Sequence, residues 1–178
     1  MPTFKREPLT ADEANALANA CATPREKLVI WTLLDTGLRI HELVNLRAEN
    51  IDWQGHQLVI HGKGKPDPRT GKLRKKRRIV PMPPRTSALL EAWFAQNGEI
   101  PIGIRGAEML VKRVANRAKI SRPCSPHVLR HTFSVGCIKK GISFPSLQAI
   151  LGHDHLSTTF IYSNMQPEVA LEEFKRKF

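Results

Sequence analysis

The sequence predicts an α+β domain that is mainly α-helical and contains one small antiparallel β-sheet. Most segments space their apolar residues at helical intervals and begin with capping signals, whereas two short segments alternate like strands. The length of 178 residues and the 41% hydrophobic composition fit one core. We therefore expect residues 1–178 to form a single domain.

The N-terminal part is expected to hold three helices. Thr10-Ala-Asp-Glu13 and Thr23-Pro-Arg-Glu26 are both capping-box sequences, and Pro24 fits a first helical position. Gly37 is expected to end the second helix. The third has an apolar stripe made of Ile40, Leu43, Val44 and Leu46. Arg39 should then lie at a helix start, beside a tight glycine turn.

Two short strands are predicted next, Gln57-Leu-Val-Ile-His61 and Arg77-Arg-Ile-Val-Pro81. Residues 62–76 between them are rich in Gly, Pro and Lys and predict a long basic hairpin. The run Lys72-Leu-Arg-Lys-Lys-Arg-Arg78 is interpreted as a contact to a nucleic-acid backbone. A solvated surface loop is the alternative.

Helical spacing returns over residues 85–97 and 105–119, and Gly98 is expected to stop the first of these helices. Ser125-Pro126 predicts the start of another, which Gly141 should end. A further helix is expected over residues 146–151, up to Gly152. Two more helices are predicted beyond it, one carrying Tyr162 and one starting at Pro167.

Lysine and arginine outnumber aspartate and glutamate by 28 to 16, which gives a net charge of +12. A nucleic-acid partner is therefore expected, because phosphate neutralisation dominates such binding; a ribosomal-type or merely soluble basic protein is the alternative. The odd set Cys21, Cys124 and Cys137 lacks Cys-x-x-Cys spacing, so neither disulfides nor a thiolate zinc site is expected. Without a signal peptide or a long apolar run, we expect a cytoplasmic protein with no membrane partner.

The segment His127-Val-Leu-Arg130-His131 places two imidazoles and a guanidinium on one helix face. Arginine offers a bidentate fork for phosphate oxygens, and histidine can move a proton near neutral pH. A cation-rich face lying on a carboxylate or on solvent is an equally simple interpretation. Three further cations, Arg39, Lys63 and His153, adjoin glycine turns, where functional side chains are often placed. Tyr162 is the only tyrosine, and alone it would indicate a core residue.

Taken in order, these residues resemble the motifs of the tyrosine recombinase (phage integrase) family, closest to its Xer and integrase branch. Thr36-Gly-Leu-Arg39-Ile-His-Glu42-Leu resembles the first arginine box, and His127-Val-Leu-Arg130-His131 resembles the His-x-x-Arg box. Leu151-Gly-His153, with Ser157-Thr-Thr-Phe-Ile-Tyr162, resembles the closing box. Lys63 matches a hairpin lysine of the family, with Lys65 as its rival. The resemblance implies the catalytic-domain fold of that family.

The resemblance also implies roles for these residues. Tyr162 would attack a DNA phosphodiester and form a 3′-phosphotyrosyl link, without metal, ATP or other cofactor. Arg39 and Arg130 would clamp the non-bridging oxygens, and His153 would add a hydrogen bond. Lys63 would protonate the leaving 5′-oxygen while His127 assists proton transfer from Tyr162. Glu42 would anchor Arg39, with an ordinary surface charge as the alternative; His131 is taken as structural.

The expected partner is double-stranded DNA, contacted along the hairpin by Lys65, Arg74, Lys75, Lys76 and Arg77. The family usually has a separate N-terminal DNA-binding domain, which we expect to be absent from residues 1–178. Residues 167–178 are expected to form a helix that docks on a neighbouring subunit in a homo-tetramer assembled on two DNA sites. Packing of that helix on its own subunit is the alternative.

Three other functions stay open. A zinc enzyme could use His127, His131 and His153 or His155, although Arg130 between the first two would repel a cation. A catalytically silent DNA-binding module could keep the fold, although it would have no use for the sole tyrosine at that place. A type IB topoisomerase would relax DNA by the same chemistry.

Overall fold

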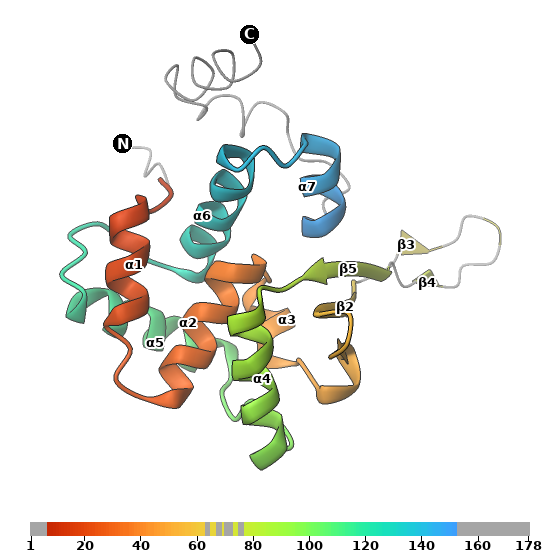
Figure 1. The fold of residues 1–178 in the computed structure, drawn as a ribbon, viewed down its shortest axis with the longest axis horizontal. Coiled ribbons are helices and arrows are strands. Elements are labelled where there is room, and N and C mark those ends of the chain that lie inside the picture. The colour runs from red at the N-terminus through yellow and green to blue at the C-terminus, as the bar shows by residue number, and fades with distance from the viewer. Residues whose placement is uncertain (1–6, 63–64, 67–68, 70–72, 75–76, 153–178) are drawn as a thin grey trace, which may run out of the picture.

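The computed structural model describes residues 7–62, 65–66, 69, 73–74 and 77–152, which form helices around a small sheet (Figure 1). The helices are α1 (Ala11–Asn19), α2 (Pro24–Thr36), α3 (Ile40–Val44), α4 (Pro84–Gln96), α5 (Ile104–Arg117), α6 (Pro126–Lys139) and α7 (Phe144–Leu151), with a 3-10 turn at Ala48–Asn50. The strands are β1 (Ile51–Asp52), β2 (Gln57–His61), β3 (Lys65–Pro66), β4 (Leu73–Arg74) and β5 (Arg77–Pro81). The predicted fold class, mainly helical with a small antiparallel sheet, is confirmed.

The core is built around α2, which contacts α4, α5 and α6. Its inward residues are fully buried: Leu28, Val29, Ile30 and Leu33. A smaller apolar cluster of Cys137, Leu147 and Leu151 joins α7 to α6. Since α7 also contacts β5, one short helix links the helical body to the sheet (Figure 1).

The main sheet has the antiparallel order β1-β2-β5. Leu58 pairs with Val80 and Ile60 pairs with Arg78, and these four residues are the buried positions of β2 and β5. Strands β3 and β4 form a separate ribbon that extends the hairpin away from the body (Figure 1). The sequence did not predict β1, β3 or β4, because two-residue strands are too short to show alternation.

Two helix-end predictions need correction. Glu26 does not close a reciprocal capping box with Thr23: its carboxylate accepts from the Ala22 N–H at 2.7 Å and pairs with Arg117 on α5. Gly98 does not stop α4, because the backbone and side-chain nitrogens of Asn97 already bond the Trp93 carbonyl. The predicted ends at Gly37, Gly141 and Gly152 are confirmed by positive φ at each.

No helix in the described part of the chain has the length and apolar character needed to cross a membrane. The helices predicted around Tyr162 and after Pro167 lie outside the described residues.

Candidate functional site

Arg39 is held at the start of α3 by the glycine turn that ends α2. Gly37 adopts φ 61°, and Arg39 is the N-cap of α3. A Cβ at Gly37 would lie 2.9 Å from Cε1 of Phe133 on α6, so glycine is required by packing as well as by φ. The turn therefore lies against α6, and Arg39 lies at a helix start beside a tight glycine turn, as predicted.

Arg130 lies on α6, which begins at the N-cap Ser125 with Pro126 at its first position, as predicted. The Arg130 side chain is buried and donates to the carbonyls of Gly37 at 2.5 Å and Leu151 at 2.8 Å. Burial, together with the charges of Arg39 and Arg78, lowers the pKa of Arg130 to about 9. The guanidinium is still charged at neutral pH, in a place that favours an added anion.

Glu42 lies under Arg39 and holds it in two ways. Its Oε2 accepts from the Arg39 backbone N–H at 2.8 Å, and its Oε1 accepts from Arg39 Nη1 at 3.1 Å. Burial acts to raise the pKa of Glu42, but hydrogen bonds from Arg78 and Arg39 and their charges lower it to about 2. The predicted contact between Arg39 and Glu42 is thus present, and the Glu42 carboxylate is ionised at neutral pH.

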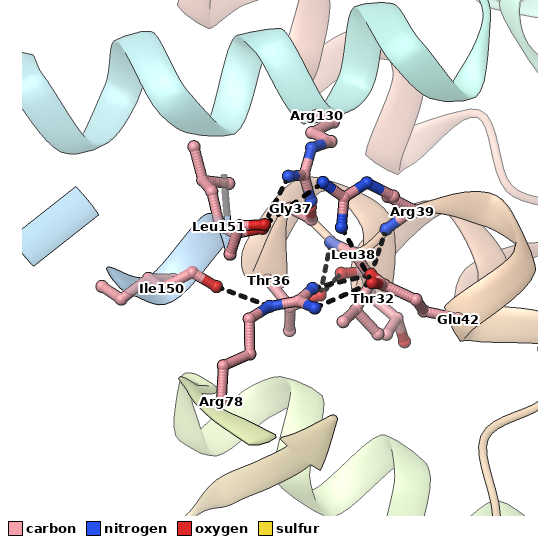
Figure 2. A network of polar contacts seen from close by, with 11 residues as sticks. Thr32, Thr36, Gly37, Leu38, Arg39, Glu42, Arg78, Arg130, Ile150 and Leu151 are labelled. Atoms are coloured by element: carbon pink, nitrogen blue, oxygen red, sulfur yellow. Dashed lines mark hydrogen bonds and ion pairs between the residues drawn. The ribbon is translucent and has the colours of Figure 1, made fainter. Parts of the chain in front are cut away.

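Arg78 also belongs to this site, although the sequence did not predict it. It was included in the basic run predicted to contact nucleic acid, but its side chain is only 7% exposed and pairs with Glu42. Both terminal nitrogens donate to Glu42, at 2.8 and 2.7 Å, and Nε donates to the Ile150 carbonyl at 2.9 Å (Figure 2). The alternation Arg78-Ile79-Val80 was the available signal, since it places Arg78 on the same buried face as Val80.

The end of α7 closes the cluster. Carbonyls of three successive residues accept from three arginines: Ile150 from Arg78, Leu151 from Arg130 and Gly152 from Arg39, the last at a long 3.5 Å. Figure 2 shows the arginines converging on this end and on Glu42. The segments that carry the first arginine box and the His-x-x-Arg box therefore meet at Leu151 and Gly152, the first residues of the predicted closing box.

A cleft of about 1430 Å³ opens beside this cluster, between α3, β5 and α7. Its cationic lining includes Arg39, Arg77 and Arg78, and Glu42 is the one carboxylate among the described residues that line it. The Arg39 side chain is 31% exposed and lines the cleft, whereas the Glu42 side chain is buried. A partly exposed arginine beside a buried, already neutralised carboxylate is an arrangement suited to bind a phosphate group.

The remaining predicted residues differ in how far the structure describes them. His127 is exposed at the start of α6, and Arg77 is exposed on β5. Burial lowers the pKa of the half-buried His131. Lys65 and Arg74 pair across β3 and β4, where the backbone alone is described. The predicted residues outside the described ranges are Lys63, Lys75, Lys76, His153 and Tyr162.

No group of three or more His, Cys, Asp or Glu side chains suited to a metal ion occurs among the residues that the structure describes. The histidine set considered for zinc includes His153 and His155, which lie outside them.

The chain is similar to known proteins over most of its length. The model of the phage integrase family matches residues 7–168. A tyrosine recombinase of Thermosipho africanus is 31% identical over 181 residues, covering 94% of this chain, and tyrosine recombinase XerC of Lactobacillus leichmannii is 28% identical over 164 residues, covering 88%. The chain spans 60% and 56% of the lengths of these two relatives.

Solved structures show the same fold. The crystal structure of XerA recombinase superposes with a TM-score of 0.78 at 25% identity, covering 96% of this chain and 64% of that one. The Tn1549 transposon integrase in complex with circular intermediate DNA gives 0.71 at 20% identity, covering 99% and 69%. With the family match spanning nearly all of its sequence, the chain belongs to the phage integrase family.

Proposed function

We propose that this chain is the catalytic domain of a site-specific DNA recombinase that cuts and rejoins double-stranded DNA through a 3′-phosphotyrosyl intermediate. The observation that carries the proposal is the convergence of Arg39 and Arg130 on the end of α7, directly before His153. Glu42 supplies only one negative charge beside the three guanidiniums of Arg39, Arg78 and Arg130, so the cluster keeps a positive charge that favours an added anion. The scissile phosphate is the anion that this family acts on.

In the proposed reaction, the Tyr162 oxygen bonds to phosphorus as the bond to the 5′-oxygen breaks. The tyrosine proton passes to His127, and Lys63 gives a proton to the departing 5′-oxygen; Lys65 is the alternative donor. Arg39 and Arg130 neutralise charge on the non-bridging oxygens, assisted by His153. The phosphotyrosyl link conserves the bond energy, so attack by a 5′-hydroxyl reverses the step without ATP.

We also propose the partner, the assembly and the compartment of this reaction. The relatives named XerC and XerA are recombinases, and the Tn1549 integrase was solved on DNA, which supports double-stranded DNA as the partner here. We further propose assembly as a homo-tetramer on two DNA sites, in the cytoplasm. The hairpin residues Lys65, Arg74, Lys75, Lys76 and Arg77 are proposed to contact the DNA backbone.

Covalent trapping tests the proposal. Nicked suicide duplexes tiled from DNA flanking the protein's own gene are incubated with the chain, and protein-linked DNA is sought on a denaturing gel. A shifted band that is absent with Tyr162→Phe supports the function and locates the site. A band that persists in Tyr162→Phe contradicts the assigned nucleophile. DNA binding without any covalent product would favour the catalytically silent module, and relaxation of supercoiled plasmid without strand exchange would favour topoisomerase activity.

A further inference from the structure

Arg78 occupies a position that a strand normally gives to an apolar residue. It lies on β5 between the exposed Arg77 and Ile79, on the buried face that also holds Val80. Burying a guanidinium is costly unless its donors are satisfied. Here three of its nitrogens are bonded, two to Glu42 and one to the Ile150 carbonyl.

These bonds connect the two parts of the site that hold Arg39. Both oxygens of Glu42 are shared: Oε1 accepts from Nη1 of Arg78 and Nη1 of Arg39, and Oε2 accepts from Nη2 of Arg78 and the Arg39 backbone. Ile150 belongs to the last turn of α7, two residues before the Gly152 carbonyl that Arg39 reaches. One side chain thus fixes the carboxylate beneath Arg39 and the helix end beside it.

Arg78 and Arg39 differ in how deeply their side chains are buried, which indicates different roles. The Arg78 side chain is 7% exposed, against 31% for Arg39, so a phosphate in the cleft would meet Arg39 first. An ion pair buried in this way is weak evidence for a stabilising purpose, because an apolar pair of similar size often serves stability as well. A bidentate fork that also bonds a third group does something an apolar pair cannot do: it sets the orientation of the carboxylate.

We propose that Arg78 is a positioning residue for DNA cleavage: it orients Glu42 and the end of α7, and through them holds Arg39 in place to neutralise the scissile phosphate. The inference rests on the proposed function. A lysine would keep the positive charge beside Glu42, but it lacks the fork needed to span both carboxylate oxygens while bonding Ile150.

The test compares single-turnover strand cleavage by the full chain on two suicide duplexes. One has an ordinary scissile phosphate, and the other has a methyl group in place of one non-bridging oxygen, which removes the charge that Arg39 would neutralise. Arg78→Lys and Arg78→Gln are expected to cleave the ordinary duplex about 10- to 100-fold more slowly at saturating DNA, with unchanged affinity. On the methylated duplex, both Arg78 variants should cleave at nearly the rate of the unsubstituted chain. Arg39→Ala, which removes the arginine itself, should show the same recovery.

Arg85→Gln is the matched control. Arg85 forms a two-point pair with Asp35 on the α2–α4 side, outside the cleft, so its loss removes another arginine–carboxylate pair, with a more exposed arginine, without touching the site. It should cleave both duplexes like the unsubstituted chain. If Arg78→Gln fails to fold, Arg78→Lys carries the comparison, because it leaves no uncompensated charge on Glu42.

Failure of the positioning role and failure of the proposed function would give different results. Equal slowing of Arg78→Lys on both duplexes, or no slowing on either, overturns the positioning role while the function stands. No covalent product from the unsubstituted chain overturns the proposed function and this inference with it.

Discussion

Gly152 lies against the side chain of Arg78: a Cβ at this glycine would stand 2.6 Å from Cδ and 3.1 Å from Nε of the arginine. Arg78 cannot move aside cheaply, because its nitrogens are bonded to Ile150 and Glu42. Gly152 also has φ 64°, which L side chains rarely adopt. We predict that Gly152→Ala lowers the free energy of unfolding by about 1 to 2 kcal/mol in urea titrations, and slows DNA cleavage.

Gly136→Ala is the control for this substitution. Gly136 lies inside α6, where no described atom comes within 4 Å of an added Cβ. Alanine should therefore stabilise the protein by roughly 0.5 to 1 kcal/mol, because it restricts the unfolded chain and favours helix. Equal effects of the two substitutions would contradict the close contact between Gly152 and Arg78.

Glu42→Gln should destabilise the protein strongly at neutral pH and weakly in acid. The pKa of Glu42 is lowered from 4.5 to about 2, because burial is outweighed by Arg78 and Arg39. That difference corresponds to roughly 3 kcal/mol of folding free energy, present above pH 4.5 and lost as the pH falls through about 2. Urea unfolding at pH 7 and pH 3 measures the gap between Glu42→Gln and the unsubstituted chain.

The gap should narrow at pH 3, because this pH lies between the unfolded pKa of Glu42, 4.5, and its folded pKa of about 2, so part of the stabilising contribution has been lost while the folded carboxylate is still ionised. Glu91→Gln, on the exposed face of α4, controls for loss of a surface carboxylate and should change stability little at either pH. A gap that stays constant between the two pH values would show that Glu42 is held by packing and not by its charge.

Much of the fold followed from local signals in the sequence. The caps Thr10, Thr23 and Ser125 and the glycines Gly37 and Gly152 fixed helix ends, because each satisfies or permits a terminal backbone arrangement by itself. Where a tertiary contact decides, the prediction was wrong. The capping box predicted for Glu26 and Thr23 does not form, because the Glu26 carboxylate bonds instead to the Ala22 N–H and to Arg117, a residue ninety-one positions away along the chain.

In the candidate site, too, residues in local motifs were predicted and a residue held by distant contacts was not. Arg39, Glu42 and Arg130 were found because they lie in short motifs at fixed spacing. Arg78 was missed because its partners, Glu42 and Ile150, are distant in sequence, at separations of 36 and 72 residues. In a run of basic residues, composition indicates a solvated or DNA-facing surface, and only the strand register reveals that one member points inward.

Deleting residues 167–178 tests the proposed tetramer. If this segment docks on a neighbouring subunit, its removal should lower cooperative assembly on two DNA sites more than binding to one site. Gel-shift titrations with one-site and two-site duplexes measure both. Equal loss in the two titrations would indicate instead that the segment packs on its own subunit.

The salt dependence of DNA binding distinguishes the neighbouring arginines of β5. Arg77 is exposed and lines the cleft, so a phosphate contact would release about 0.9 of a counterion, and Arg77→Gln should lower the slope of log K against log salt by that amount. Arg78 is buried against Glu42, so Arg78→Gln should leave the slope unchanged. Fluorescence-anisotropy titrations at several salt concentrations measure both slopes. A reduced slope for Arg78→Gln, with none for Arg77→Gln, would reverse the assignment of which arginine meets the DNA.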